Sequence, residues 1–346
     1  MHRTRFAALL GLLLTVSLLS TACNSKPAAP APATGDSTAS AAAKPPKKVS
    51  LILDWYPNAV HSFIYAAVSQ GYFKAEGLDV DIKMPADDPT AGIKLVGTGS
   101  ETFALYYQPD TLMAREEGVP VVSIGAVVRH PLNGLMVPTA SGIKSPKDLV
   151  GKQIGFPGIP LNQALVNTMV AKDGGDPTKV KLTDVSFDLI PAIATKKTDG
   201  IAGGFLNHEK LVLEKQGIPM TYFAPQDWGV PNYYELVLIT GEQTLKNDPA
   251  TVAAFWRALA KGQEYVTQHP DDALKLVLDK QDKEFPLDKD VETQSLKLLL
   301  PLMSDAQHPF GSQSADDWKN VAAWLKQAGL IKGTTDPNTA FANPAK

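Results

Sequence analysis

The stretch VSLILDWYPNAVHSFIYAAVSQGYFKAEGLDVDI, residues 49–82, decides the fold class of this 346-residue chain. It opens with a short apolar run that ends in a charge, Val49–Asp54, which predicts a buried strand. Asn58 then provides a helix cap, apolar residues follow at helical spacing, and Gly71 gives a stop signal. The alternating run Leu78–Ile82 predicts the next strand. The stretch therefore predicts a strand, a helix and a second strand, which is the repeating unit of α/β proteins.

The same alternation continues along the chain. Further strands are predicted at 102–107, 121–128, 152–156, 200–205 and 234–240, and helices at 110–117, 162–172, 189–197, 208–216, 249–268, 271–278, 291–300 and 315–328. Alternating elements of this kind imply doubly wound, mainly parallel sheets in an α/β fold. Because roughly 300 residues exceed one comfortable core, we expect two lobes joined by a hinge.

Two lobes require the chain to cross between them twice. We place the first crossing near Pro138 and the return near Leu238, on either side of a polar break at 144–149. The predicted domains are lobe 1 at 49–138, lobe 2 at 139–237, and a return to lobe 1 with the C-terminal helices at 238–346. The sequence shows no internal repeat and no transmembrane run.

The N-terminal segment 1–22 predicts a lipoprotein signal peptide. Two arginines precede the uncharged run Phe6–Leu19, which is shorter than the roughly 20 residues that span a bilayer. The following letters, LSTAC, end at Cys23 and are similar to a bacterial lipobox, whose cysteine carries acyl chains such as palmitate. Residues 23–48 then form the anchor and a disordered linker rich in Ala, Pro and Ser. We expect a protein anchored to the extracytoplasmic face of the cell membrane; the alternative is a plain secretory signal with an incidental cysteine.

Composition and missing motifs exclude several classes of function. With 33 Lys and Arg against 36 Asp and Glu, the net charge of −3 argues against general nucleic-acid binding. A single cysteine excludes an intramolecular disulfide and any cysteine-built metal site. The six histidines are scattered, and no nucleotide-phosphate, zinc-protease or nucleophile-elbow motif occurs. Ser141 and Lys144 have the spacing of some acyl-enzymes, but their polar surroundings favour an exposed loop. We therefore expect no cofactor and no metal. We also expect a monomer.

The residues at the predicted strand ends indicate the ligand, because open α/β sheets bind ligands beyond the carboxyl ends of their strands. The candidates are Asp54, Trp55, Asn58, His61, Tyr106, Tyr107, Phe205, Asn207, Tyr234 and Glu235. Aromatic rings suit a planar ligand, and Asp54 or Glu235 could accept hydrogen bonds from an exocyclic amine or a protonated ring nitrogen. An anion would need a cationic pocket, and Arg129 is the cation that we place at a predicted strand end. Each aromatic side chain could equally be a core or rim residue.

Five blocks of sequence carry a family resemblance: LDWYPN with the following His61, GYFKAEGL at 71–78, GFPGIP at 155–160, GGFLNHE at 203–209 and GVPNYYEL at 229–236. Over residues 50 to 300 the chain resembles the solute-binding proteins of ABC importers, and within them the SsuA/THI5-like group that binds thiamine pyrimidine precursors such as formylaminopyrimidine. The second block is shared with sulfonate and nitrate binders, whereas the D-W-x-P-N and Y-Y-E blocks are more specific. The resemblance implies a type II periplasmic-binding-protein fold, with two lobes closing on a ligand that is delivered to a membrane permease and its ATPase.

The leading hypothesis is a non-enzymatic receptor for a planar aminopyrimidine. In it, the ring is walled by Trp55, Tyr106, Tyr107 and Tyr234, and its polar edge is taken by Asp54, Asn58, His61 and Glu235. Riboflavin or another heteroaromatic ring fits the same walls and remains an alternative ligand. Sulfonate and nitrate are further alternatives. Both are anions, and the sequence shows no cationic pocket that would bind them.

Two hypotheses from other classes remain. A fungal-type pyrimidine synthase of the same fold uses a lysine to hold pyridoxal phosphate, a histidine one helical turn later and a cysteine-rich segment. The corresponding positions here are Tyr106, Asp110 and 231–235, and they supply none of those residue types, which argues against the synthase. A surface adhesin, finally, would bind no small molecule at all.

Overall fold

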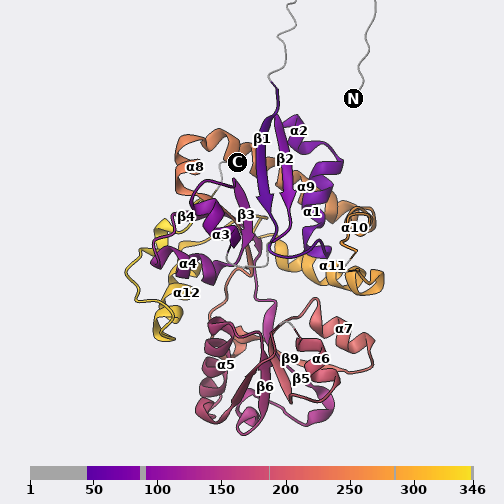
Figure 1. The fold of residues 1–346 in the computed structure, drawn as a ribbon, viewed down its shortest axis with the longest axis vertical. Helices are drawn as coiled ribbons and strands as arrows, with labels where there is room; N and C mark the ends of the chain where they lie inside the picture. Colours follow the sequence, from indigo (N-terminus) through magenta and orange to yellow (C-terminus); the bar gives the residue numbers. More distant parts are fainter. Residues whose placement is uncertain (1–44, 86–90, 187, 284–285, 344–346) are drawn as a thin grey trace, which may run out of the picture. The chain divides into compact units, whose positions relative to one another are not determined.

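A computed structural model describes residues 45–85, 91–186, 188–283 and 286–343, and these form two five-stranded sheets with helices packed against them (Figure 1). The predicted signal peptide 1–22, Cys23 and the linker as far as residue 44 lie outside the described residues. The predicted α/β architecture is confirmed.

The first sheet has the strand order β2-β1-β3-β10-β4. Its strands are β1 (Lys47–Ile52), β2 (Leu78–Lys83), β3 (Phe103–Tyr106), β4 (Val121–Val128) and β10 (Leu236–Gly241). β1 pairs in parallel with β2 and β3, whereas β10 lies antiparallel to both β3 and β4. Four strands therefore share one direction, and β10 runs against them.

The second sheet repeats this plan with the order β7-β6-β8-β5-β9. Its strands are β5 (Asn133–Pro138), β6 (Gln153–Phe156), β7 (Lys181–Asp184), β8 (Gly200–Phe205) and β9 (Met220–Phe223). β6 pairs in parallel with β7 and β8, and β5 lies antiparallel to β8 and β9. Each sheet is thus mixed in its pairing, yet mainly parallel in the direction of its strands.

Helices cover both faces of the first sheet. The helices are α1 (Ser62–Ser69), α2 (Tyr72–Ala75), α3 (Ala91–Gly97), α4 (Gln108–Glu116), α5 (Pro160–Lys172), α6 (Leu189–Ala194), α7 (Glu209–Lys215), α8 (Glu242–Asn247), α9 (Pro249–Gln268), α10 (Pro270–Leu278), α11 (Lys289–Met303) and α12 (Ala315–Gln327). Successive strand residues point to opposite faces, so Leu51 and Phe103 pack with α1 and α9, where Phe103 stacks on Phe255 at 3.9 Å between ring centroids. Ile52 and Ala104 face the other side and share a core with α3 and α12.

The first crossing between the sheets lies at 129–132, ahead of the position predicted near Pro138. β4 ends in the first sheet at Val128, and β5 begins in the second at Asn133. The prediction was wrong because 133–138 becomes a strand through its pairing with β8 and β9, which local sequence does not reveal. The return runs through 224–235, and β10 begins at Leu236, two positions before the predicted return.

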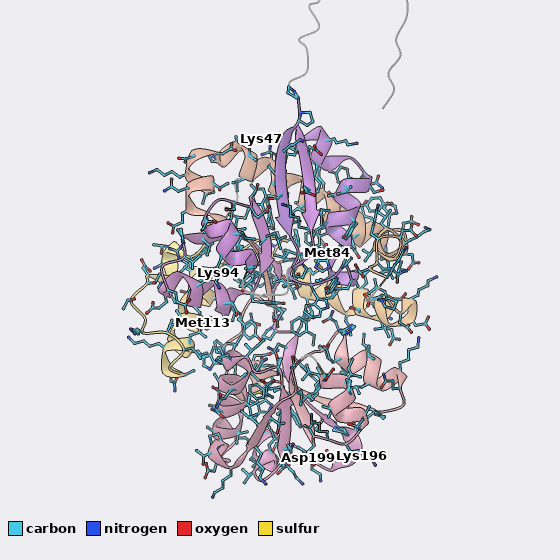
Figure 2. The ribbon with its side chains drawn as sticks, viewed as in Figure 1. Lys47, Met84, Lys94, Met113, Lys196 and Asp199 are labelled. Atoms are coloured by element: carbon cyan, nitrogen blue, oxygen red, sulfur yellow. The ribbon has the colours of Figure 1, made fainter. Side chains whose placement is uncertain are left out.

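The two sheets present the carboxyl ends of their parallel strands toward each other. In Figure 2, Lys47, at the start of β1, lies at the end of the first sheet that is remote from the second sheet. Met84, just after β2, lies at the end of the first sheet that is nearer the second sheet. Asp199, just before β8, lies at the opposite extreme of the second sheet. Strand-end residues of both sheets therefore belong to one region.

Helices of the second sheet also contact helices of the first on two flanks. On one flank, the Lys215 ammonium group of α7 pairs with Asp288 at 2.6 Å and with Asp290 of α11 at 3.0 Å. On the other, Trp324 of α12 donates its indole N–H to the Thr168 hydroxyl of α5 at 3.1 Å. Within the described ranges, no helix is both long and apolar enough to cross a membrane.

Candidate functional site

At the edge of the first sheet where its parallel strands end, two hydrogen bonds between Gln108 and Tyr234 join the segment after β3 to the segment before β10. We call this pair of bonds the clasp. Gln108, in the first turn of α4, donates its backbone N–H to the Tyr234 carbonyl at 3.3 Å. Its side-chain oxygen accepts the Tyr234 backbone N–H at 2.7 Å. Since Tyr106 of β3 pairs with Val237 of β10, this clasp places the residues after β3 beside those before β10.

Asp54 follows β1 and is oriented by two donors. The Nε2–H of His61 donates to its Oδ1 at 2.9 Å, and the Tyr107 hydroxyl donates to its Oδ2 at 3.4 Å. The His61 tautomer follows from its other nitrogen, Nδ1, which accepts the Asn58 backbone N–H at 3.1 Å. Because the His61 ring is fully buried with both nitrogens engaged, His61 positions Asp54 rather than contacting a ligand itself.

Asn58, predicted to contact the ligand, acts as a cap in the structure. Its Oδ1 accepts the Val60 backbone N–H at 3.0 Å at the start of the short 3₁₀ helix Ala59–His61. Its Nδ2 donates to the Tyr56 carbonyl at 3.0 Å. Both polar atoms of this side chain are therefore occupied by the turn that carries His61.

Glu235 lies at the junction of the two crossing segments. Its Oε2 accepts the backbone N–H groups of Leu132 at 2.7 Å and of Asn133 at 2.9 Å. Burial raises the pKa of Glu235 to about 7, although those two amide bonds act in the opposite direction. Glu235 thus connects the return segment to the first crossing. With a pKa of about 7, its carboxyl group changes its protonation state near neutral pH.

Near Glu235 lie other side chains, one carboxyl group and two tyrosine hydroxyls, whose pKa values are raised by burial. Burial raises the pKa of Asp110, in the first turn of α4, to about 6. Burial, followed by the charge of Asp54, raises the pKa of the Tyr107 hydroxyl well above its usual range, and burial with the charge of Glu235 does the same for Tyr233. The edge therefore combines three carboxyl groups with two tyrosines that stay protonated, a set rich in hydrogen-bond acceptors.

The edge of the second sheet carries amides and glycines instead. Asn133, at the start of β5, donates from Nδ2 to Asn162 Oδ1 at 2.7 Å. Gly203, at φ +96°, lies so close to Asn162 that a Cβ there would come within 2.6 Å of its Nδ2. Asn207 reaches across to the first sheet's helices, where its Nδ2 donates to the Ser295 hydroxyl of α11 at 3.0 Å. Phe205, half-buried, packs against the core that contains Leu51.

The predicted aromatic wall is divided by the structure. Trp55 keeps 40% of its surface exposed, edge-on to Tyr56 with ring centroids 5.9 Å apart. Tyr107 is half-buried next to Asp54, while Tyr106 is buried in the core that contains Ile52.

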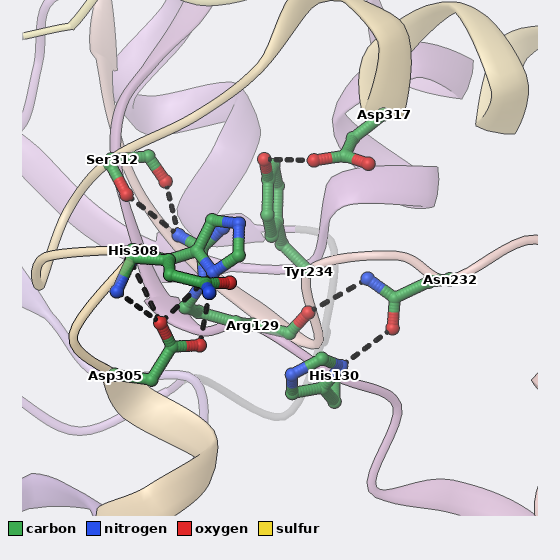
Figure 3. Close-up of polar contacts among 9 residues, drawn as sticks. Arg129, His130, Asn232, Tyr234, Asp305, His308, Ser312 and Asp317 are labelled. Carbon is green, nitrogen blue, oxygen red and sulfur yellow. Dashed lines mark hydrogen bonds and ion pairs between the residues drawn. The ribbon is translucent and has the colours of Figure 1, made fainter.

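Tyr234 does not join that wall, which corrects the prediction for this residue. Its hydroxyl donates to Asp317 of α12 at 2.6 Å and accepts the Ser314 backbone N–H at 2.9 Å. The Arg129 guanidinium, bonded to the Ser312 carbonyl, lies 5.4 Å from the Tyr234 ring centroid (Figure 3). Tyr234 is therefore a packing residue, and its neighbour Tyr233 belongs to the acidic edge.

Sequence reasoning left three residues of this region out of the candidate site: Asp110, Asn133 and Tyr233. The Y-Y pair was visible in the sequence, but residues adjacent in an extended segment point to opposite sides. Only the pairing register shows which tyrosine faces the carboxyl groups. Asn133 was missed because its strand was missed.

The described residues hold no group of three His, Cys, Asp or Glu side chains placed to bind a metal ion. Two surface hollows, of about 600 and 550 Å³, lie on the flanks, the first between α7 and α11 and the second between α5 and α12. Neither includes the strand-end residues, so the candidate site rests on the polar set described above and not on a hollow.

Comparisons with known proteins agree with this architecture. Residues 58–273 match the family described as NMT1/THI5 like. A formylaminopyrimidine-binding protein of Halalkalibacterium halodurans is 45% identical over 85% of this chain and 89% of its own length. A 4-amino-5-hydroxymethyl-2-methylpyrimidine phosphate synthase of Legionella pneumophila is 29% identical over 86% of this chain and 91% of its own. The aliphatic sulphonate-binding protein SsuA of Escherichia coli, 12% identical, superposes with a TM-score of 0.67 over 87% of this chain and 94% of its own. The chain has the two-lobed fold of periplasmic binding proteins and belongs to the NMT1/THI5-like family.

Proposed function

We propose that this protein is the solute-binding component of an ABC importer and captures a planar aminopyrimidine precursor of thiamine. The observation that carries the proposal is the acceptor-rich edge of the first sheet, where Asp54, Asp110 and Glu235 gather around Tyr107 and Tyr233. An aminopyrimidine offers N–H donors to such a set, and its ring offers a flat face to aromatic side chains. The 45% identity to a formylaminopyrimidine-binding protein supports this ligand class.

The proposal is of binding without catalysis. The synthase resemblance implies a lysine at the position of Tyr106, and that position holds a tyrosine buried in the core. Asp110 occupies the position of the implied histidine, one helical turn later. The residues at these positions supply no amine for a covalent aldehyde adduct, which favours the binding role over the synthase role.

Two crossing segments, 129–132 and 224–235, connect the lobes, which suits a hinge that closes on a ligand. The Asn232 amide bridges these segments: its Nδ2 donates to the Arg129 carbonyl at 3.1 Å, and its Oδ1 lies 2.8 Å from His130 Nδ1 (Figure 3). In the proposed cycle, the closed monomer then docks on the permease, which works with its ATPase subunit. We further propose that Cys23 carries the lipid anchor, with the residues from 24 to 46, ahead of β1, as the tether to the extracytoplasmic membrane face.

Calorimetric titration of the purified protein tests the ligand. Formylaminopyrimidine is expected to bind more tightly than riboflavin and far more tightly than an alkanesulfonate, because three carboxyl groups disfavour an anion. If Trp55 stacks on the ring, Trp55→Ala should weaken binding by about 2 kcal/mol. The control is Val68→Ala, which shortens another exposed apolar side chain, on α1, and should leave the affinity unchanged. Tighter binding of riboflavin would replace the pyrimidine with the flavin as the ligand.

Labelling of cells with radioactive palmitate tests the anchor. Label is expected in the wild-type protein and not in Cys23→Ser, and the wild type should fractionate with membranes. Unlabelled wild-type protein in the medium would instead indicate a plain secretory signal.

A further inference from the structure

The segment that follows β8 contacts the first lobe away from the two crossing segments. Asn207 of this segment donates from Nδ2 to the Ser295 hydroxyl of α11 at 3.0 Å, and Phe205, the last residue of β8, packs against the apolar core of the first sheet. Neither Asn207 nor Ser295 lies in the crossing segments, 129–132 and 224–235. The chain itself therefore does not hold this contact together, and the two side chains can separate when the lobes move apart.

Both side chains of this hydrogen bond are buried, and their burial is only partly compensated. Asn207 keeps 6% of its surface exposed, and Ser295 keeps 2%. Asn207 Nδ2 is paired with Ser295, but Asn207 Oδ1 has no hydrogen-bond partner among the described residues. Because an unpaired buried polar atom costs at least as much as one hydrogen bond contributes, this polar contact alone gives little preference for joined lobes. A bound ligand can therefore decide whether the contact forms.

The helix α11 makes a second contact one helical turn before Ser295, with the segment that orients Asp54. The Oε2 atom of Glu292, a buried side chain, accepts the Ala59 backbone N–H at 2.7 Å. Ala59 begins the 3₁₀ helix that ends at His61, and His61 donates to Asp54 at 2.9 Å. Because residues three apart on a helix share one face, the same face of α11 contacts both the segment that carries His61 and the second lobe.

We propose that the Asn207–Ser295 hydrogen bond is a latch that joins the second lobe to α11 when a ligand is bound and slows the release of that ligand. Both residues then act as positioning residues, and neither touches the ligand, so Asn207 has a role different from the ligand contact that the sequence predicts. This inference rests on the proposed function and extends it, because it assigns part of the affinity to a contact outside the ligand.

A latch and a ligand contact predict opposite orders of effect for two substitutions. Ser295→Ala leaves the buried Asn207 amide N–H without its partner, and this penalty applies only while the lobes are joined. Asn207→Ala removes the hydrogen bond together with the unpaired Oδ1, so its loss and its gain partly cancel. With a latch, Ser295→Ala therefore has the larger effect. If Asn207 instead bound the ligand, Asn207→Ala would have the larger effect.

Stopped-flow fluorescence of the purified protein, with formylaminopyrimidine as the probe, tests the latch. Ser295→Ala should raise the dissociation rate constant by about 5-fold or more. The association rate constant should change less, because the latch forms after the ligand has entered. In an Asn207→Ala background, Ser295→Ala should change the dissociation rate constant by less than about 2-fold, since its partner is already absent. Circular dichroism melting of each variant checks that it folds.

Thr293→Ala is the matched control, because it removes a hydroxyl from the exposed side of the same helix, where Thr293 donates to the Lys289 carbonyl at 2.8 Å. It should leave both rate constants unchanged. A folded Ser295→Ala protein that releases the probe at the wild-type rate overturns the inference while the proposed function stands. So does an Asn207→Ala protein that loses more affinity than Ser295→Ala, or a Ser295→Ala effect that persists in full without Asn207. A wild type that does not bind formylaminopyrimidine overturns the proposed function together with the latch.

Discussion

The two sheets follow the same strand plan but differ in the chemistry beyond their strand ends. The first sheet ends in carboxyl groups and tyrosines, and two of the carboxyl groups are held by two donors each, Asp54 by His61 and Tyr107 and Glu235 by the Leu132 and Asn133 amides. The second ends in amides and glycines, where Gly203 allows Asn162 to approach the backbone closely. Under the proposed function, the first edge would select a ligand by its hydrogen-bonding pattern and charge, whereas the second would select mainly by shape.

The two edges are also stabilised in different ways. The stability of the first edge depends on pH and on the hydrogen-bond donors of buried carboxyl groups such as Glu235, because an unpaired buried charge is costly. The close approach at Gly203 depends on the absence of a side chain, which pH does not affect. Mutations on the two edges should therefore differ both in size and in pH dependence.

The largest expected effect is at the second edge. Gly203→Ala places a Cβ 2.6 Å from Asn162 Nδ2 and 2.8 Å from Pro157 Cδ, at a φ of +96°. We expect a loss of about 3 kcal/mol in the free energy of unfolding, measured by urea denaturation. Gly217→Ala is the control, because its φ is +81° but nothing lies within 4 Å of the added carbon. It isolates the backbone strain and should cost about 1 kcal/mol. Equal losses would show that close approach does not constrain this edge.

The next effect is the pH dependence of the first edge. Glu235 has a pKa of about 7 in the folded protein and an ordinary value of 4.5 when unfolded. Between these values the folded state binds more protons than the unfolded state, so stability should fall as pH rises from 4.5 to 7. The decrease attributable to Glu235 between these two pH values should total about 2.5 kcal/mol. Glu235→Gln should make the decrease in this window smaller, with the raised pKa of Asp110 keeping part of it, and Gly203→Ala should leave the slope unchanged. A wild-type profile that rises across this window would contradict the buried, proton-retaining carboxyl group.

A smaller effect is expected at Tyr234, which packs the first sheet against α12. Tyr234→Phe removes a donor from Asp317 and an acceptor from the Ser314 backbone N–H. The expected loss of unfolding free energy is about 1.5 kcal/mol, since one of the two bonds involves a charged group. Asp317→Asn keeps a side-chain oxygen that can accept from Tyr234 and should cost less. A loss in Tyr234→Phe no larger than in Asp317→Asn would mean that the hydroxyl contributes nothing beyond the packing of the ring.

The local pattern was sufficient for much of this architecture. The helix predicted at 249–268 has the same bounds in α9, where Asp248 caps it and Pro249 starts it. The strand predicted at 102–107 is found at Phe103–Tyr106, so Tyr107, the last residue of the predicted strand, lies just beyond the observed one. These elements carry their own start, stop and burial signals, so a single sequence reveals them.

What the sequence missed depends on pairing between distant segments. β5 has a weak local pattern, NGLMVP, and exists as a strand because β8 and β9 lie on either side of it. The assignment of Tyr234 to the ligand wall, and the omission of Tyr233, came from the same missing information about register. Asn58 was correctly expected to cap a helix. The prediction that it also contacts a ligand overlooked that both polar atoms of its side chain are used in hydrogen bonds to the backbone of Val60 and Tyr56.

The smallest effect is expected on the flank where the lobes meet through charge. Lys215 of α7 pairs with Asp288 and Asp290 at the start of α11, and all three side chains are exposed. Exposed ion pairs contribute little and weaken with salt, so Lys215→Ala should change ligand affinity by less than about 2-fold at physiological salt. Lys275→Ala, which removes an exposed pair between α10 and Asp279 at its C-terminal end, is the control and should match it. If Lys215→Ala alone weakens binding 10-fold or more at low salt and recovers the wild-type ratio at high salt, this flank helps to hold the lobes together around the ligand. The contrast between a selective first edge and a shape-determined second edge would then need a third contributor, outside the strand ends.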